Sequence, residues 1–294
     1  MSASPDTSEA APTLPATLRL GPVHLAVTDL DRSIGFYRDA IGLRLHHREG
    51  AAAVMGAGAA DLLVLLEEPN ARPAARHAGL YHFALLHPSR LELARAAKRL
   101  IAGRVAISGA SDHGISEAIY LPDPDGNGIE LAADRPRAEW GDLRDPSVIG
   151  PKPLDLEGLL ALVADEEPAA QADAGLVVGH LHLHVGDVEE GLAFYRDVLG
   201  FEPMTLFPSA AFVSAGGYHH HLAFNTWRGA GAAPAPDGVV GLRRWTVFLE
   251  RDSELEDVRE RAVAAGGEPV DVDGGVLLRD PWGHPVLFAT APSG

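Results

Sequence analysis

Three residues in the first half of the chain have the types and spacing of metal ligands: His24, His82 and Glu130. Each lies in a short apolar run, where the side chains of a strand alternate between two faces. The apolar neighbours then face a covering helix, and the polar residue faces the other way. If the two halves of this region fold into a cup, the three side chains converge inside it. Two neutral imidazoles and one carboxylate form the facial triad that suits Fe(II) and leaves coordination positions open.

Each of these residues also has a simpler explanation. A single histidine in an apolar strand is more often a hydrogen-bonded core residue, and a single glutamate in a strand usually faces solvent. These three residues, however, stand at equivalent ends of repeated units. That coincidence favours metal ligation over three unrelated structural roles.

The repeated units belong to a tandem duplication. VHLAVTDLDRSIGFYRDAIGL (23–43) returns as LHLHVGDVEEGLAFYRDVLGF (181–201) at an offset of 158 residues. DPDGNGIEL (123–131) returns as DPWGHPVLF (280–288) at an offset of 157 residues. A register held over such a length is the signature of an internal repeat, so the chain contains two copies of one domain.

Each copy contains two related halves that begin with a strand: VHLAV, YHFALL, LHLHV and RWTVFL. A helix and further short strands follow each of them, which predicts an α+β fold rich in antiparallel pairs. The four predicted helices carry start and stop signals. They are a first helix capped by Asp29 or Asp31 and ended by Gly42, a second from Ser89 to Gly103, and two more at 188–199 and 253–265.

The copies and their connections predict four segments. These are a disordered tail at 1–17, a metal-binding domain at 18–135, a linker with one short helix at 136–175, and a second domain at 176–294. The tail lacks the basic and apolar regions of a signal peptide, and no apolar run approaches the ~20 residues of a membrane helix. We therefore expect a cytoplasmic protein that has no membrane partner.

Charge and cysteine content narrow the chemistry further. The formal net charge is −17, which disfavours nucleic-acid partners because phosphate binding needs clustered Lys and Arg. The chain has no cysteine, which excludes disulfides and thiolate ligands. Any metal must therefore be held by histidines and carboxylates.

The opening VHLAV…FYRD..G, the strand YHFALL and the segment SEAIYLPDPDGNGIEL resemble the vicinal oxygen chelate superfamily. This superfamily includes glyoxalase I, bleomycin-resistance proteins and extradiol catechol dioxygenases. The resemblance implies tandem duplicated domains, each of two βαβββ modules closing a mixed sheet around a central cup. It also implies that His24, His82 and Glu130 are the metal ligands, because they occupy the three motif positions.

Within the superfamily, the chain most resembles two-domain extradiol dioxygenases of the catechol 2,3-dioxygenase type. SDHGIS…Y…DPDGNGIE is similar to their segment with an active-site His, a Tyr and the Glu ligand, which implies second-sphere roles for His113 and Tyr120. A surface turn at His113 and simple packing of Tyr120 are the alternatives. Glyoxalase I-type enzymes use a further carboxylate from the last strand of the first half. That strand offers only leucines and a valine at 62–66, which argues against the isomerase interpretation.

The second copy has lost part of the motif. His182 aligns with His24, whereas Arg244 and Leu287 stand at the positions of His82 and Glu130. An arginine and a leucine cannot bind a metal ion, so the second triad is broken and a non-catalytic second domain is favoured. The alternatives are a weaker site of its own and a contact that brings its histidines near the first site. Six histidines are involved: His180, His182, His184, His219, His220 and His221.

One of these histidines has a further candidate role. The segment HHHLAF resembles the extradiol segment that supplies the acid–base histidine, and this implies a catalytic role for His220. That residue lies in the other copy from the expected triad, so the acid–base residue is left unassigned. A run of adjacent histidines at a strand end is also compatible with a surface feature.

The leading hypothesis is an extradiol ring-cleaving dioxygenase that uses Fe(II) or Mn(II), a small catechol-type aromatic and O₂. One alternative is a glyoxalase-like isomerase or lyase, for which Zn(II) or Ni(II) would serve. Another is a non-catalytic resistance-type protein that binds an aromatic ligand. The substrate, the native metal and the oligomeric state are left open, with a homodimer among the options.

Overall fold

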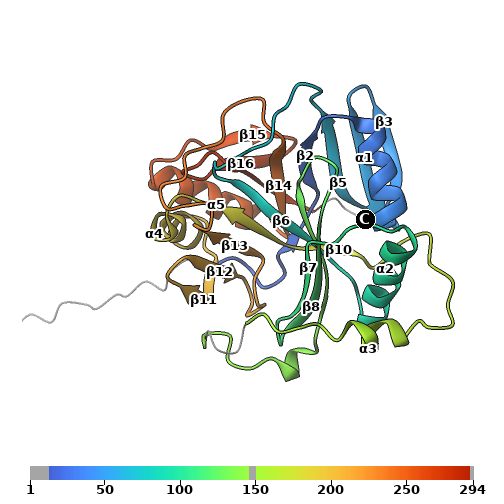
Figure 1. The fold of residues 1–294 in the computed structure, drawn as a ribbon. Coiled ribbons are helices and arrows are strands. Elements are labelled where there is room, and N and C mark those ends of the chain that lie inside the picture. Colours follow the sequence, from blue (N-terminus) through green and yellow to red (C-terminus); the bar gives the residue numbers. More distant parts are fainter. Residues whose placement is uncertain (1–12, 146–149, 292–294) are drawn as a thin grey trace, which may run out of the picture.

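The computed structural model describes residues 13–145 and 150–291, which form four βαβββ modules (Figure 1). Module 1 contains β2 (Val23–Val27), α1 (Leu30–Phe36), β3 (Arg44–Glu49), β4 (Ala52–Ala57) and β5 (Ala60–Glu67). Module 2 contains β6 (Gly79–Leu86), α2 (Arg90–Ala102), β7 (Gly109–Asp112), β8 (Ser116–Pro122) and β9 (Gly128–Asp134). Module 3 contains β10 (Val177–His184), α4 (Val188–Leu192), β11 (Glu202–Phe207), β12 (Ala210–Ser214) and β13 (Leu222–Asn225). Module 4 contains β14 (Gly241–Leu249), α5 (Asp252–Ala264), β15 (Val270–Val272), β16 (Gly275–Arg279) and β17 (Pro285–Thr290).

Short elements complete the chain. The strand β1 (Arg19–Leu20) pairs with β14, and the helix α3 (Leu156–Ala161) lies in the segment predicted as a linker with a short helix. π-helical turns at Tyr37–Ile41 and Ala193–Val198 follow α1 and α4, and a 3₁₀ turn spans Arg137–Glu139. The α+β class and the repeated βαβββ modules are thus confirmed.

The modules combine across the two copies. One sheet has eight strands in the order β11-β12-β13-β10-β6-β9-β8-β7, so it joins module 3 to module 2. The other sheet has nine strands: β15-β16-β17-β14-β2-β5-β4-β3, with β1 beside β14, so it joins module 4 to module 1. Figure 1 shows this exchange as blue strands beside red ones and green strands beside yellow ones. The expectation that the two modules of one copy close around one site is therefore corrected: each sheet takes one module from each copy.

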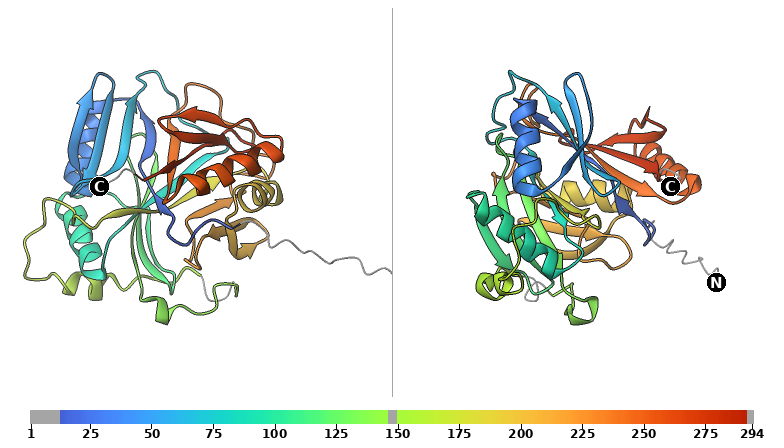
Figure 2. Two further views of the ribbon diagram at one scale, coloured as in Figure 1. Left: turned by 180° about the vertical axis from the view of Figure 1, so that it is seen from behind. Right: turned by 90° about the vertical axis from the view of Figure 1, so that its right-hand side faces the viewer.

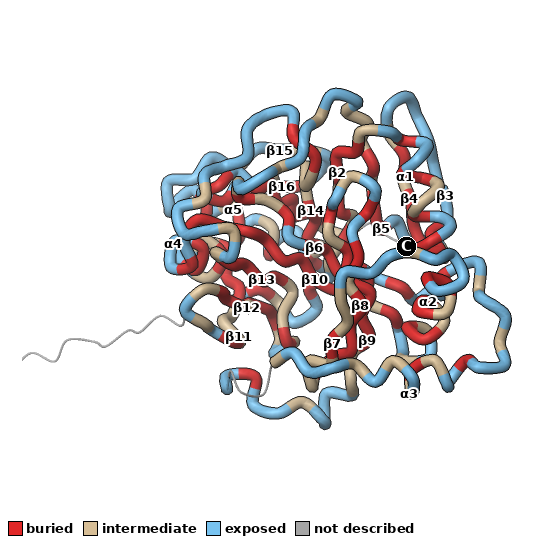
Figure 3. The backbone as a smooth tube through the Cα atoms, viewed as in Figure 1, coloured by how far each residue is buried: buried red, intermediate tan, exposed pale blue. Residues whose placement is uncertain are grey.

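The helices cover the outer faces of the sheets, and α1, α2 and α5 lie on the outside of the molecule in both views of Figure 2. Alternation of side chains explains this arrangement. In β10, Leu181 and Leu183 are fully buried and belong to the apolar core, while the residues that alternate with them are His180, His182 and His184. Buried segments follow the central strands, whereas the edge strand β3 is exposed along its whole length (Figure 3). The concave faces are thus free to carry polar side chains.

The two modules of one copy are tied together by the repeated FYRD and DP motifs. The hydroxyl of Tyr37 donates to Asp123 at 3.0 Å, and the same carboxylate accepts the backbone N–H groups of Asp125 and Asn127 at 2.8 Å each. Tyr195 donates to Asp280 at 2.8 Å in the second copy. Each motif therefore holds the helix of one sheet against a turn of the other.

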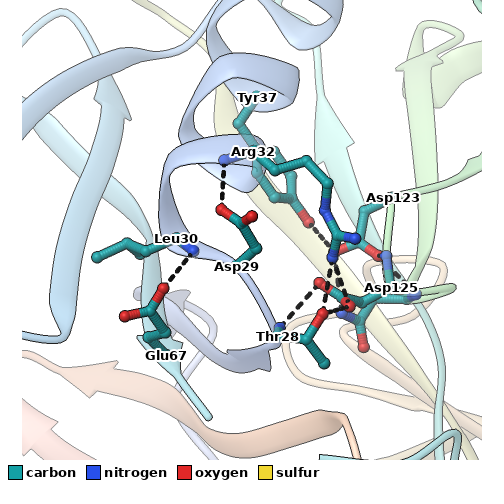
Figure 4. A network of polar contacts seen from close by, with 9 residues as sticks. Thr28, Asp29, Leu30, Arg32, Tyr37, Glu67, Asp123 and Asp125 are labelled. Atoms are coloured by element: carbon teal, nitrogen blue, oxygen red, sulfur yellow. Dashed lines mark hydrogen bonds and ion pairs between the residues drawn. The ribbon is translucent and has the colours of Figure 1, made fainter. Parts of the chain in front are cut away.

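A second set of contacts at the same place anchors the start of α1 (Figure 4). The side chain of Asp29 accepts from the backbone N–H of Arg32 at 2.9 Å, which confirms one of the two predicted caps. The hydroxyl of Thr28 donates to Asp125 at 2.6 Å, and the Arg32 guanidinium pairs with the same carboxylate at 2.7 Å. Gly42 ends the helical segment with a φ of 85°, a conformation that favours glycine.

The predicted tail at 1–17 lies largely outside the described residues. Within the described part, Leu14 is buried, and its N–H donates to the carbonyl of Gly200 at 2.8 Å. In the linker, Glu166 pairs with Arg95 of α2 at 2.7 Å. No helix in the residues that the structure describes is long and apolar enough to cross a membrane.

Candidate metal centre

Three buried side chains converge on the concave face of the eight-stranded sheet: His82 on β6, Glu130 on β9 and His180 on β10. A single Glu130 oxygen, Oε2, lies 3.0 Å from His82 Nε2 and 3.1 Å from His180 Nε2. The two Nε2 atoms are 3.3 Å apart. The three donor atoms therefore form a nearly equilateral triangle.

The sheet register produces this convergence. The strand β6 lies between β9 and β10, with Ala84 beside both Glu130 and His180. Glu130 stands between the buried Ile129 and Leu131 in β9, so alternation turns its carboxylate to the concave face. This is the face predicted for His82 and Glu130.

The structure does not bring His24 to this group. His24 lies on β2 of the nine-stranded sheet, where it is the cross-strand partner of Arg244 on β14. Its Nε2 is 3.2 Å from Arg244 Nη2, and burial together with this guanidinium lowers the pKa of His24 to about 4. Alternation placed His24 on a concave face as predicted, but on that of the other sheet. His24 therefore lies outside the cluster, and His180 stands where His24 was expected.

The sequence contained a signal for His180 that the repeat alignment hid. Histidines stand at alternate positions 180, 182 and 184 of one strand, so all of them share a face. The alignment matched His182 to His24 and directed attention to that position. In the structure, His182 is the cross-strand partner of His82, and its Nε2 accepts a hydrogen bond from Asn225 Nδ2 at 2.8 Å.

The other predicted site residues line the same cavity as the three donors. Tyr120 on β8 is the cross-strand neighbour of Glu130, and its hydroxyl is 2.8 Å from His113 Nε2. His220 packs its ring against His180, with ring centroids 4.1 Å apart. The histidines of the second copy thus reach the site through the shared sheet. The second copy is a contributor to the site of the first copy.

The cavity has a volume of about 1090 Å³ and mixed walls. Aromatic side chains form one part of it: Tyr81, Phe207, Phe212 and Trp227. Linker residues Gly150–Pro153 form another part, and Lys152 exchanges two backbone hydrogen bonds of 2.9 Å with Asp112. Among the described lining residues, Glu130 carries the only carboxylate.

The electrostatics favour an ionised Glu130 with a neutral His82 imidazole beside it. Burial alone would raise the pKa of Glu130, but His180 and His82 hold it well below its usual range. Burial lowers the pKa of the His82 and His182 imidazoles. Burial and the Glu130 charge raise the pKa of the Tyr120 phenol, which therefore keeps its proton. His82 and Glu130 are therefore in the protonation states that a metal ion requires of its ligands.

Comparison with known proteins agrees with this architecture. The model of the glyoxalase/bleomycin resistance protein/dioxygenase superfamily matches residues 19–131 and 177–288. The chain belongs to this superfamily. A catechol-2,3-dioxygenase of Bacillus subtilis (strain 168) is 42% identical to this chain over 268 residues. The match covers 89% of this chain and 93% of the Bacillus protein.

Solved structures share the fold of this chain. A putative dioxygenase from Bacillus subtilis superposes with a TM-score of 0.66 at 14% identity, covering 97% of this chain and 87% of the other. Glyoxalase I from Zea mays superposes with a TM-score of 0.58 at 19% identity, covering 93% of this chain and 92% of the other. At these identities the likeness concerns the fold.

Proposed function

We propose that the protein is a metal-dependent extradiol-type dioxygenase that opens the ring of a catechol-type aromatic with O₂. The metal ion is Fe(II) or Mn(II), and its ligands are His82, Glu130 and His180. The convergence of these three donors supports the proposal most directly. An ion about 2.1 Å from each donor, bound at right angles, separates neighbouring donor atoms by about 3.0 Å. The observed separations are 3.0, 3.1 and 3.3 Å.

The charge balance of the cluster also supports a bound cation. Glu130 is only 3% exposed, and its ion-pair partners among the described residues are the two imidazoles alone. A buried carboxylate without a cationic partner is costly because charge is poorly solvated in the protein interior. A divalent cation would offset the charge of Glu130 and occupy the lone pairs of both Nε2 atoms.

The remaining side chains suit an aromatic diol. A divalent iron or manganese ion would supply redox and Lewis-acid chemistry at its open coordination positions. Phe212 and Trp227 offer apolar surface to the ring of the substrate. Tyr120 and His220 belong to the same lining, where they would contact the hydroxyl groups of the substrate.

An isomerase or lyase that uses the same ligands is the second candidate, and the fold shared with glyoxalase I favours it. Glyoxalase I-type chemistry uses a further carboxylate ligand, whereas Glu130 is the only carboxylate among the described cavity residues. The three-donor cluster therefore agrees better with the dioxygenase.

Anaerobic reconstitution tests the proposal. The chelated protein is loaded with Fe(II) or Mn(II), mixed with a series of catechols and exposed to air-saturated buffer. We expect uptake of one O₂ per catechol and a yellow ring-fission product. If the protein is fully loaded with metal and takes up no O₂ with any of the catechols tested, the dioxygenase proposal is falsified. Turnover with Ni(II), Co(II) or Zn(II) and no O₂ consumption would instead indicate an isomerase or lyase. Equal metal content in the wild type and in His82→Ala would favour a binding protein.

A further inference from the structure

A chain of hydrogen bonds leads from the end of β9 to the candidate metal centre. The Asp134 carboxylate lies 2.9 Å from His219 Nε2 through Oδ1 and accepts the Tyr218 hydroxyl at 2.9 Å through Oδ2. His219 Nδ1 lies 2.7 Å from His220 Nδ1. His219 is 1% exposed, so the middle of this chain is shielded from water.

The chemistry of the end group sets the direction of every bond in the chain. An ionised carboxylate can only accept, so His219 Nε2 carries a proton and donates it to Asp134. Burial disfavours a charged imidazole, and a neutral His219 then has a lone pair on Nδ1. His220 must therefore donate from its Nδ1. In a neutral His220 the lone pair is left on Nε2.

The remaining nitrogen of His220 is available to the cavity. The His220 ring lines the cavity and lies against His180 and Phe212, with centroid distances of 4.1 and 5.0 Å. Its Nδ1 is occupied by His219, and no hydrogen bond within the described residues uses Nε2. A ligand hydroxyl that enters the cavity would find an acceptor at this atom.

We propose that Asp134 and His219 are positioning residues that hold His220 in the tautomer whose Nε2 accepts a hydrogen bond from a hydroxyl group of the bound ligand. Neither residue lines the cavity, so both act through His220. The identity of that ligand as a catechol rests on the proposed function, but the tautomer does not depend on it.

Histidine side-chain NMR tests the tautomer directly. The full chain is labelled with ¹⁵N-histidine and loaded with diamagnetic Zn(II), and long-range ¹H–¹⁵N correlations identify the protonated nitrogen of each ring. His220→Gln assigns the signal. We expect a protonated Nδ1 and an unprotonated Nε2 in the wild type and in Tyr218→Phe, which retains the Asp134–His219 bond. Asp134→Leu and His219→Leu should each abolish this single tautomer.

Binding of 4-nitrocatechol provides the second measurement. Loss of one well-placed hydrogen bond should weaken its binding about tenfold in Asp134→Leu and in His219→Leu, with Tyr218→Phe unchanged. In the NMR spectra, the tautomer of His182 serves as an internal reference, because its hydrogen-bond partner Asn225 is not altered in any variant. A wild type with the proton on His220 Nε2 would overturn the proposal. So would folded Asp134→Leu and His219→Leu variants that keep both the tautomer and the affinity. Absence of O₂ uptake would contradict the proposed dioxygenase function and would leave the proposed tautomer of His220 standing.

Discussion

Replacement of His180 by alanine should weaken metal binding by about two orders of magnitude, whereas replacement of His24 should leave it unchanged. The buried cluster keeps only His82 and Glu130 as donors after His180→Ala. Structural zinc sites gain about 10–16 kcal/mol from their ligands, or about 3 kcal/mol for each of four. Because about 1.4 kcal/mol corresponds to a factor of ten, loss of one ligand raises the Kd about 100-fold.

The two variants distinguish the proposed site, which is the cluster of His82, Glu130 and His180, from the ligand set expected from the repeat, which includes His24. His24 is half-buried and contacts Arg244 at 3.2 Å in the other sheet, so His24→Ala is a matched histidine deletion outside the cluster. The assay is anaerobic titration of chelated protein with Mn(II), with free Mn(II) measured by its EPR signal. Circular dichroism and gel filtration check that both variants are folded. A His180→Ala variant with wild-type affinity, or a His24→Ala variant that loses the metal, would refute the assignment.

Three further predictions concern stability and the cavity. Tyr37→Phe removes the hydroxyl that donates to the buried Asp123, so urea unfolding should show a loss of about 1–2 kcal/mol; an unchanged midpoint would contradict this role. Burial lowers the pKa of the His87 imidazole to about 3 in the folded protein. As the pH falls, His87 is therefore protonated in the unfolded chain before it is protonated in the folded chain. Stability should fall by about 1.4 kcal/mol per pH unit as the pH drops from 6.5 toward 3, and the wild type and His87→Leu should differ by this slope in urea titrations at several pH values. Trp227→Ala removes an exposed aromatic wall beside His182 and should weaken 4-nitrocatechol binding about two- to tenfold with unchanged metal content; equal affinity would exclude Trp227 from the binding surface.

Features that depend on neighbouring residues could be predicted from the sequence. The cap at Asp29, the end of the helical segment at Gly42 and the four modules are all present. Alternation within a strand is also local, and it turned His82 and Glu130 to a concave face as predicted. These predictions needed no knowledge of which strands lie side by side.

The pairing of modules could not be predicted in this way. The central strands β2, β6, β10 and β14 share one pattern, and hydrophobic periodicity does not choose among partners with the same pattern. The structure pairs β6 with β10 and β2 with β14. This long-range choice moved His24 away from His82 and brought His180 to it. The difference between the expected ligand set and the observed cluster follows from this one choice.

The pairing also changes the meaning of the sequence differences between the copies. The offset of 158 residues sets Pro22 against His180, and the aligned strands set Arg244 against His82 and Leu287 against Glu130. All three of these replacements lie in or beside the nine-stranded sheet, and all three candidate ligands converge in the eight-stranded one. When the two sequence copies are compared, the first has an intact triad, and the second has a broken triad and several histidines without an assigned role. When the two sheets are compared, the concave face of the eight-stranded sheet holds all three donor residues, which come from both copies. The equivalent three positions of the nine-stranded sheet hold no donor. The asymmetry therefore lies between the sheets, and each copy supplies part of the one site.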